Sequence, residues 1–499
     1  MSATKHPLWA RARAEWSAPL THDLRVDVAV VGGGITGITA ALNLVKAGKR
    51  VVLVEAHALC EGESANTTAH LTTAVDARYV TIKKNFGEEA ARLVFRASQD
   101  AIHQIAALSA WMKIDCAFRV VPGYLYAEKE KDLRDLHLEY ETLRALGAPV
   151  ENTRDVPLPF KTCGAVRFDA NARFNPSLYL EGLLHALTDS GCRIYENTPV
   201  VEFHDGEPGL LRTPKGRISA DSIILATHAP LNRLFVQTKL VHYRSYAMAF
   251  LYDGEIGDGL FWDTESPYHY IRKATVDNAN YIIVGGEDHK TGQEDHADLA
   301  FERLLSYSKE RFGVHAAANR WSGQIIESID GLPFIGRNSA CTNVYIATGF
   351  AGNGLTFGTV AGNLLSDLVL GRQNPYEEIF SATRVKPVAG ATAFMGQAVD
   401  YPAHLIGDRL GGGEGGEVSH LPPGEGRVLR VGNESLAVYR DELGALHALS
   451  PVCTHLGCHV KFNSAEKSWD CPCHGSRFSI DGVVMNGPAL IPLTQKKIG

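Results

Sequence analysis

The sequence predicts an α/β domain that is interleaved with an α+β domain and followed by a small separate domain at the C-terminus. Three observations predict this arrangement. A glycine-rich turn near the N-terminus joins an apolar strand at residues 26–31 to a helical stretch and a second strand. Two long insertions, at about residues 81–170 and 236–324, interrupt the later strands of that domain. Residues 453–476 contain two loops in which cysteine and histidine lie close together, a pattern typical of a metal centre.

The composition limits the classes of protein to which the chain can belong. Its 499 residues are too many for one compact core and predict two to four domains. Hydrophobic residues make up 45% and charged residues 21%, the ordinary balance of a globular protein. The net charge of −7, without a run of lysines or arginines, argues against nucleic acid and anionic membranes as partners. No apolar stretch reaches the roughly 18 residues of a spanning helix, and residues 1–9 contain no apolar targeting segment, so we expect a soluble cytoplasmic protein.

The N-terminal motif is a complete βαβ dinucleotide-binding unit, because strand, glycine-rich turn, helix and second strand follow one another in register. Its glycines permit the tight turn and close approach of the backbone, and the helix N-terminus holds the pyrophosphate. Glu55 ends the second strand, where an acid binds a ribose diol and disfavours a 2′-phosphate. The unit therefore predicts FAD or NAD rather than NADP. Its expected contact residues are Gly32, Gly34, Ile35, Thr36, Gly37, Glu55 and Ala56.

The C-terminal loops supply the ligands that a Rieske [2Fe-2S] centre needs. Cys453 and His455 lie in the first loop, and Cys471 and His474 lie in the second. Such a centre has two thiolates on one iron and two imidazoles on the other. A zinc ribbon is the alternative, but the first pair is spaced Cys-x-His and each loop holds one surplus cysteine. We therefore predict a one-electron relay.

The segments Cys-Thr-His-Leu-Gly-Cys and Cys-Pro-Cys-His-Gly-Ser resemble the cluster loops of Rieske proteins from quinol-oxidising cytochrome complexes. The resemblance covers about the last 80 residues and implies a small all-β Rieske domain at 419–499. Ser476 stands where the family places a hydroxyl that bonds to the cluster, whereas Phe478 replaces a tyrosine of high-potential members, so we expect an intermediate potential. The resemblance implies Cys453 and Cys471 on one iron, His455 and His474 on the other, and a disulfide between Cys458 and Cys473.

Three later motifs favour FAD over NAD. A strand ending in Ala-Thr227-His, the run Asp-Gly-Leu-Pro-Phe-Ile-Gly336, and a strand that enters a glycine-rich turn and a helix at 344–370 follow in this order. Together they resemble the D-amino-acid-oxidase family of FAD enzymes, which includes sarcosine, glycine and putrescine-type amine oxidoreductases. The resemblance spans about residues 24–375. It implies Rossmann-type FAD-binding parts at about 24–80, 171–235 and 325–375, with substrate-domain parts at 81–170 and 236–324.

The same resemblance implies further contacts with FAD. The usual Asn-Gly-Gly of the flavin loop is replaced by Thr67-Thr68-Ala69, so the family's substrate face cannot be transferred to this chain. The Trp-His context of covalent relatives is missing around His70, so we expect noncovalent FAD. The implied contacts are Gly62, Ser64, Thr67, Thr68, His70, Val201, Thr227, Gly336, Gly349, Gly352, Asn353, Gly354, Leu355 and Thr356.

The two insertions have different expected structures. The first is predicted to be largely helical, with helices at 88–108 and 128–146, whereas the second alternates as strands at 243–251, 268–273 and 281–284. Tyr270 and Arg272 lie on one of these strands and are our candidates for catalytic contact with the substrate. The alternative for each is a position on a solvent-facing strand.

Residues 376–418 are predicted to link the two halves of the chain, since they contain scattered prolines and the glycine-rich run 411–416. Within this linker, residues 396–410 are compatible with a short docking helix or with plain linker.

The two halves together predict an FAD-dependent oxidoreductase that acts on the C–N bond of an amine or amino acid. Hydride passes to FAD, single electrons pass to the Rieske cluster, and an external acceptor takes them. The helix that begins near 352–355 is expected to direct its N-terminal amides at the flavin. An NAD(P)H-dependent reductase would need a second dinucleotide motif, but the sequence contains only the one at residues 26–55. A redox sensor would show no turnover with amines. The oligomeric state is left open, with a homo-oligomer compatible.

Overall fold

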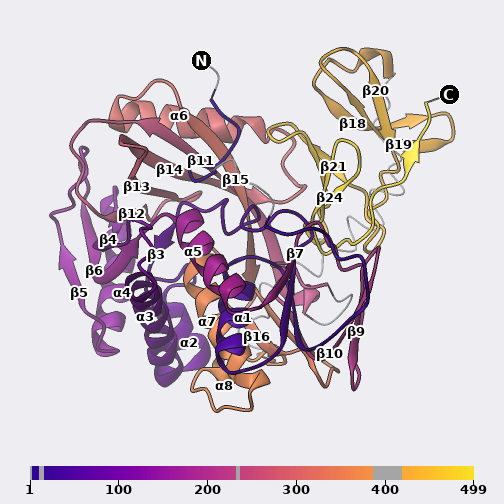
Figure 1. The fold of residues 1–499 in the computed structure, drawn as a ribbon. Helices are drawn as coiled ribbons and strands as arrows, with labels where there is room; N and C mark the ends of the chain where they lie inside the picture. The colour runs from indigo at the N-terminus through magenta and orange to yellow at the C-terminus, as the bar shows by residue number, and fades with distance from the viewer. Residues whose placement is uncertain (1–2, 11–15, 232–235, 386–417, 499) are drawn as a thin grey trace.

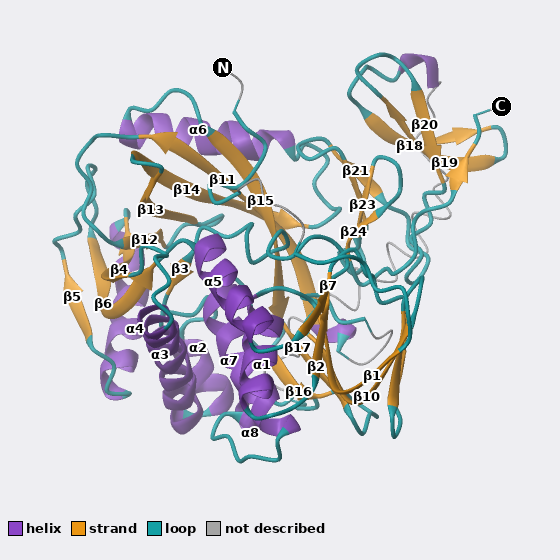
Figure 2. Ribbon diagram, in the orientation of Figure 1, coloured by secondary structure: helices purple, strands orange, loops and turns teal. Residues whose placement is uncertain are grey.

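The computed structural model describes residues 3–10, 16–231, 236–385 and 418–498. Two large sheets and their helices form the body of the molecule, and a small β domain lies at one side of this body (Figures 1 and 2). The three predicted units, α/β, α+β and all-β, are therefore confirmed. No helix within the described ranges is long and apolar enough to cross a membrane.

The first sheet contains the parallel strands that the βαβ motif predicts. β1 pairs in parallel with β2 on one side and with β10 on the other, so the chain reverses its strand order at β1. Ligands of open α/β sheets bind at such a switch point, outside the C-terminal ends of the strands. The sheet contains, in order, β16 (Phe334–Arg337), β17 (Val344–Thr348), β10 (Arg217–Leu225), β1 (Leu24–Val31), β2 (Val51–Val54) and β7 (Arg193–Tyr195), with β9 (Gly209–Arg212) and β8 (Glu202–His204) added beside β10.

A layer of helices packs beside this sheet (Figure 2). α1 and α7 approach closely because glycines face threonines between them: a Cβ on Gly362 would lie 2.6 Å from the Cβ of Thr39. Asn175 caps α5 by accepting a hydrogen bond from the backbone of Leu178, and Pro176 starts the helix without needing a donor. The helices of this layer are α1 (Ile35–Lys46), α2 (Tyr79–Phe86), α3 (Glu88–Trp111), α5 (Pro176–Asp189) and α7 (Gly354–Val369).

The second sheet is formed mainly by the two insertions. The helix predicted at 88–108 is α3, and the one predicted at 128–146 is the short η1 (Glu130–Asp132) with α4 (Leu133–Ala145). The expectation of a largely helical first insertion is incomplete, because that insertion also supplies three strands of the sheet. α6 (Asp298–Phe312) packs on β11 and β14. The order is β15 (Asn319–Ser328), β11 (Leu240–Leu251), β14 (Ala279–Lys290), β13 (His269–Val276), β12 (Leu260–Asp263), β4 (Arg119–Ala127), β6 (Gly164–Arg173) and β3 (His70–Leu71), with β5 (Val150–Thr153) beside β6.

The C-terminal domain consists of two four-stranded antiparallel sheets and a short turn, η4 (Val418–His420). Trp469 and Phe478 are completely buried in its core beside Cys453 and Cys471. One sheet contains β18 (Gly426–Val431), β19 (Glu434–Arg440), β20 (Leu446–Leu449) and β25 (Gln495–Lys496); the other contains β21 (Lys461–Asn463), β22 (Ser468–Asp470), β23 (Arg477–Ser479) and β24 (Val484–Asn486).

The predicted linker begins later than expected. Residues 376–385 include α8 (Glu377–Phe380), whose Phe380 is buried in the core formed with α7, so this part belongs to the body of the molecule. The rest of the predicted linker, including the segment 396–410 and the glycine run 411–416, lies outside the described residues.

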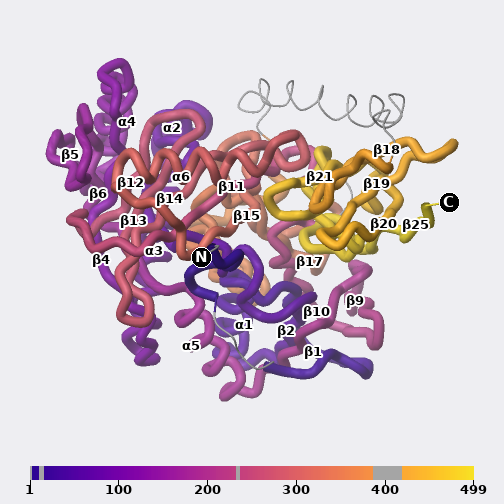
Figure 3. The backbone as a smooth tube through the Cα atoms, turned by 90° about the horizontal axis from the view of Figure 1, so that it is seen from above, coloured from indigo at the N-terminus to yellow at the C-terminus, as the bar shows by residue number. Residues whose placement is uncertain are grey.

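The C-terminal domain lies against the second sheet, next to β15 and β11 (Figure 3). Arg244 on β11 donates through Nε and Nη2 to the carboxylate of Glu466, at 2.9 and 2.8 Å. Arg477 of the C-terminal domain contacts the same carboxylate at 2.9 Å. Both arginines are buried, and Arg477 also pairs with Asp470 at 3.0 Å, so two carboxylates balance the two cations at this contact.

Candidate active site and cluster site

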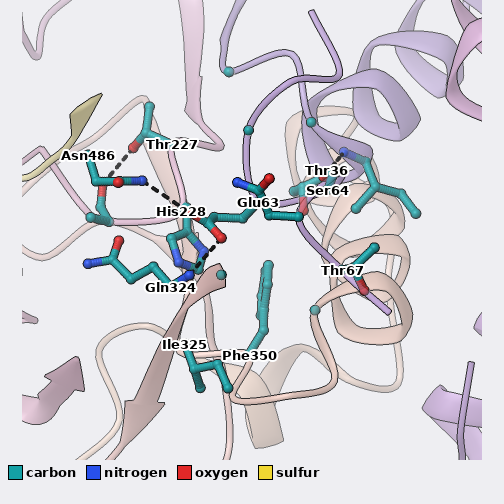
Figure 4. Close-up of a pocket in the computed structure, with 18 of the residues that line it drawn as sticks. Thr36, Glu63, Ser64, Thr67, Thr227, His228, Gln324, Ile325, Phe350 and Asn486 are labelled. Carbon is teal, nitrogen blue, oxygen red and sulfur yellow. Dashed lines mark hydrogen bonds between the residues drawn. The ribbon is translucent and has the colours of Figure 1, made fainter. Parts of the chain in front are cut away.

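A cavity of about 960 Å³ lies at the switch point of the first sheet. It extends from the glycine turn after β1 to the N-terminus of α7 and to the second sheet. Figure 4 shows Thr36, Ser64 and Thr67 on one side of it, with Thr227, His228, Gln324 and Asn486 on the other. A cavity of this size suits a large cofactor and a small substrate together.

The nucleotide end of the cavity is built as the βαβ motif predicts. The carboxylate of Glu55 accepts hydrogen bonds from the backbone of Gly33 at 2.7 Å and of His57 at 3.0 Å, which holds it at the mouth of the turn. Ser64 approaches from the next loop and accepts a hydrogen bond from the backbone of Ile35 at 3.0 Å. Gly34, the N-cap of α1, and Asn353, the N-cap of α7, make no side-chain capping hydrogen bond, so both helix N-termini can act on an anionic group in the cavity.

Most of the residues predicted from the sequence line this one cavity. Of the predicted FAD-contact and catalytic residues, five do not: Gly37, Gly336, Gly349, Thr356 and Arg272. Gly37 and Thr356 are buried in α1 and α7, behind the turns that face the cavity. The predicted residues on the cavity wall are Gly32, Gly34, Ile35, Thr36, Glu55, Ala56, Gly62, Ser64, Thr67, Thr68, His70, Val201, Thr227, Tyr270, Gly352, Asn353, Gly354 and Leu355.

Arg272 lies behind the cavity wall rather than in it. Its guanidinium is buried and donates to the carbonyl oxygens of Thr68 at 3.1 Å and of Ala69 at 2.6 Å. The guanidinium carbon of Arg272 lies 5.2 Å from the centre of the Trp9 ring. Trp9 also donates through Nε1 to the carbonyl oxygen of Thr67 at 2.7 Å. The two side chains therefore hold the loop that replaces the family's Asn-Gly-Gly. Sequence reasoning did not find Trp9, because its contact is made 58 residues away along the chain.

The side of the cavity that faces the second sheet is acidic. Asp76 accepts a hydrogen bond from the backbone of Gly352 at 2.6 Å, and burial raises the pKa of Asp76. Asp76 is open to the cavity but enclosed by the protein otherwise. Burial, with Asp76 nearby, also raises the pKa of Glu327 to about 7. These carboxylates share the wall with Tyr268 and with Tyr270, whose hydroxyl lies 2.8 Å from that of Ser245. Neither acid was predicted from the sequence. Asp76 lies in a loop and Glu327 lies within β15, and neither segment contains a recognisable motif.

The four predicted cluster ligands lie together at the edge of the C-terminal domain. Cys453 and Cys471 are both buried, and the rings of His455 and His474 lie 4.9 Å apart. Hydrogen bonding with Cys471 lowers the pKa of Cys453 to about 7, and the Ser476 hydroxyl acts in the same direction. The same hydrogen bond, together with burial, raises the pKa of Cys471, so one thiolate of the pair is favoured, the form that binds iron.

The two surplus cysteines are paired. A disulfide joins Cys458 of the first cluster loop to Cys473 of the second, as expected. The disulfide ties the two loops together at the side of the four ligands.

The C-terminal domain forms part of the cavity wall, which the sequence did not predict. Residues 483–487 and 489–490 of the C-terminal domain, with Pro492, line the cavity together with His228 and Gln324. Asn486 donates to the carboxylate of Glu63 at 3.1 Å, and the backbone of Gln324 donates to the same carboxylate at 2.7 Å. No local sequence pattern predicts this contact, because it joins segments that are far apart in the sequence.

Residues 27–368 match the family of FAD dependent oxidoreductases, and residues 415–496 match the Rieske [2Fe-2S] domain. The chain belongs to the FAD dependent oxidoreductase family. It is a member with a C-terminal Rieske domain, and its cofactors are FAD and a Rieske [2Fe-2S] cluster.

Two relatives resemble this oxidoreductase over most of its length. It is 36% identical over 483 residues to the Rieske 2Fe-2S iron-sulfur protein YhfW of Bacillus subtilis (strain 168), covering 95% of this chain and 94% of that protein. It is 25% identical over 416 residues to gamma-glutamylputrescine oxidoreductase of Escherichia coli (strain K12), covering 79% of this chain and 95% of that protein.

Solved structures with the same fold include a glycine oxidase and an L-amino acid deaminase. Glycine oxidase from Geobacillus kaustophilus superposes with a TM-score of 0.63 at 19% identity, over 72% of this oxidoreductase and 99% of that chain. L-amino acid deaminase from Proteus vulgaris superposes with a TM-score of 0.61 at 17% identity, over 75% and 100%. At these identities the likeness establishes the fold of the oxidoreductase alone.

The described residues fit both cofactors. Uncapped N-termini of α1 and α7, with Glu55 at the end of β2, provide the charges that the pyrophosphate, the flavin and the ribose of FAD require. Two buried thiols and two histidine rings in facing loops provide the donor set of a Rieske cluster.

Replacing Phe478 by tyrosine is expected to raise the midpoint potential of the cluster. Phe478 is fully buried in the core that contains Cys453 and Cys471. A hydroxyl that donates to a ligand sulfur stabilises the reduced cluster; about 1.5 kcal/mol for such a bond corresponds to roughly 60 mV for one electron. Redox titration followed by electron paramagnetic resonance (EPR) measures the shift. Tyr439→Phe, which removes a hydroxyl elsewhere in the same core, is the control and should leave the potential unchanged.

Proposed function

We propose that this oxidoreductase removes hydride from a carbon bearing an amine and passes the electrons one at a time through its Rieske cluster to an external acceptor. The observation that carries the proposal is the shared wall: residues of the Rieske domain line the cavity that also contains the dinucleotide motif. FAD, when bound, takes two electrons as hydride, and a Rieske cluster takes one at a time. The fixed contact between the two sites supports a direct internal route between them.

The lining of the cavity favours an amine over an amino acid as the substrate. Near the second sheet, the wall of described residues contains the carboxylates of Asp76 and Glu327 and the guanidinium of Arg78. Asp263 and Glu265 also lie on this wall, but Asp263 pairs with His269 at 3.0 Å and Glu265 pairs with Lys129 at 2.5 Å. Such a wall stabilises an ammonium group and repels a substrate carboxylate. The enzyme's likeness to gamma-glutamylputrescine oxidoreductase, whose name identifies an amine derivative, agrees with this preference.

The side chains of the chain have distinct parts in the proposed reaction. Glu327, with its pKa raised to about 7, can take the proton of an arriving ammonium ion and leave the neutral amine. Tyr270, which the sequence selected as a catalytic candidate, would orient the amine together with Ser245. The N-terminus of α7 would stabilise negative charge on the reduced cofactor. Arg272, the second catalytic candidate, would act only through the loop at Thr68 and Ala69 that it holds.

Anaerobic mixing with matched substrate pairs tests this function. Each pair consists of an amino acid and its decarboxylated amine, such as lysine and cadaverine, so that the two differ in one carboxylate. We expect the amine to bleach the flavin absorbance and the EPR signal of the reduced cluster to appear in the same samples. Bleaching by the amino acid alone would overturn the preference for amines. Bleaching by NADH with no amine active would overturn the proposed function.

A further inference from the structure

One buried glutamine contacts both the flavin cavity and the cluster loop. Gln324 lies on β15, is 4% exposed and lines the cavity beside His228 (Figure 4). Its Nε2 donates to the carbonyl oxygen of Gly475 at 2.7 Å, and Gly475 directly follows the cluster ligand His474. Its Oε1 is buried and has no hydrogen-bond partner among the described residues. A buried amide with half of its bonding capacity unused calls for a functional explanation.

A histidine on the adjacent strand is also buried with polar atoms that lack a hydrogen-bond partner in the described ranges. His242 on β11 is 6% exposed, and neither of its ring nitrogens has a hydrogen-bond partner within the described part of the chain. His242 packs directly against the cluster loop, because a Cβ added to Gly475 would lie 2.6 Å from the Cβ of His242. The backbone of Gly475 also has a φ of +67°, in the left-handed region. Only glycine therefore permits this approach between the two domains.

A second histidine continues the row to the cavity. His228 follows the end of β10, adopts the left-handed region at φ +61°, and lines the cavity. Thr348 holds its backbone there by donating to its carbonyl oxygen at 2.7 Å. His228 lies beside Gln324 on the cavity wall (Figure 4). A strained backbone and unpaired buried side chains in one place are typical of functional positions.

We infer that Gln324, His242 and His228 form a bridge that holds the cluster loop against the flavin cavity, so that electrons pass directly between the two sites. The inference rests on the proposed transfer from flavin to cluster. In that step one electron leaves the reduced flavin and enters the oxidised cluster; no bond between heavy atoms forms or breaks, and flavin protons leave to solvent. A one-electron acceptor outside the protein then reoxidises the cluster, and the second flavin electron follows. The three residues are positioning residues, because they act through the cluster loop.

Flash reduction of the holoenzyme tests the bridge without any substrate. A small photoreductant reduces the flavin in a flash, and the absorbance of the cluster then reports the arrival of the electron. Gln324→Met keeps the size of the side chain and removes the donor to Gly475, and His242→Phe keeps a ring without nitrogens. We expect transfer to slow by on the order of tenfold or more in each variant, since a small displacement of a positioned group has effects of this size. Ser464→Ala, which removes an interdomain contact with Asp298, is the matched control and should transfer at the unchanged rate.

Cofactor content and midpoint potentials distinguish a changed electron path from a loss of folding or of cofactor. FAD and iron content and the two midpoint potentials of Gln324→Met should equal those of the parent protein, so that a slower rate reflects a changed path rather than a changed driving force. An unchanged rate in both variants, or an equal slowing in Ser464→Ala, would overturn the bridge. Absence of transfer in the parent protein would overturn the bridge together with the proposed electron route, whereas amine bleaching tests the oxidation step separately.

Discussion

Replacing Glu466 by alanine is expected to release the Rieske domain from its position beside the flavin cavity. Glu466 receives two hydrogen bonds from Arg244 of the second sheet and one ion pair from Arg477 of its own domain. Both guanidinium groups are buried, so the alanine variant leaves Arg244 without its carboxylate in the interface. Breaking a buried pair by removing one partner costs about 3–5 kcal/mol. Domain docking should therefore be largely lost.

Small-angle scattering and the rate of cluster reduction measure this release. The radius of gyration should increase and cluster reduction by the flavin should slow, while the visible spectrum of each cofactor persists. Lys461→Ala is the matched control, because Lys461 forms an exposed interdomain pair with Asp295 at 3.7 Å. An exposed pair contributes about 0–1 kcal/mol, so this control should stay docked. A Glu466→Ala protein with unchanged scattering would contradict the expectation.

The same interface should weaken in acid. Burial opposes the ionisation of Glu466, but the charges of Arg244 and Arg477 outweigh it and lower the pKa from 4.5 to about 2. Because the pKa is lowered in the folded protein, the stabilisation is fully present above pH 4.5 and is lost as the pH falls towards 2. In the parent protein, undocking should appear within this window. In Glu466→Ala, docking should show no such dependence.

Replacing Gly37 by alanine is expected to weaken FAD binding strongly. Gly37 does not touch the cavity, but its Cβ would lie 2.0 Å from the carbonyl oxygen of Gly32 and 3.2 Å from Val30. Because the obstacle is backbone, α1 must move away from β1, and the glycine turn that faces the pyrophosphate must open. Overpacking of this kind costs about 1–3 kcal/mol, which corresponds to roughly a ten- to hundredfold loss of affinity.

The FAD content of the purified protein and its titration with added FAD measure this loss. Gly48→Ala is the control: Gly48 ends the same helix region at φ +83°, and a Cβ there meets no atom within 4 Å. It should cost some stability through backbone strain but leave the FAD affinity unchanged. Full FAD occupancy of Gly37→Ala at low FAD concentration would show that the turn tolerates a displaced helix.

The dinucleotide turn and the cluster loops could be predicted because each is built from residues close together in the sequence. Gly32, Gly34 and Glu55 lie within one βαβ unit, and the two cluster loops each place cysteine and histidine within a few residues. Their chemistry depends on local spacing, so the motif contains most of the information. The helices at 88–108 and 128–146 were predictable for a similar reason, since helical periodicity is also local.

The environment of Arg272 and the strands of the first insertion could not be predicted from local sequence patterns. Arg272 has the strand alternation of a residue that reaches the substrate, but a loop 203 residues away occupies its guanidinium. The first insertion looks helical because its longest periodic segments are helices, whereas its strands β4 and β6 find their partners only in the assembled sheet. In both cases the deciding contact is long-range.

The amino-acid order alone thus established which cofactors the protein binds and predicted which residues ligate the cluster, because both properties are encoded in short segments with fixed spacing. Folding in three dimensions established how the two redox sites are related. Arg244, Gln324 and His242 come from the second sheet, and Glu466 and Gly475 come from the Rieske domain, so no segment of the chain contains the interface. The burial that makes these contacts strong exists only after both domains have excluded water from between them.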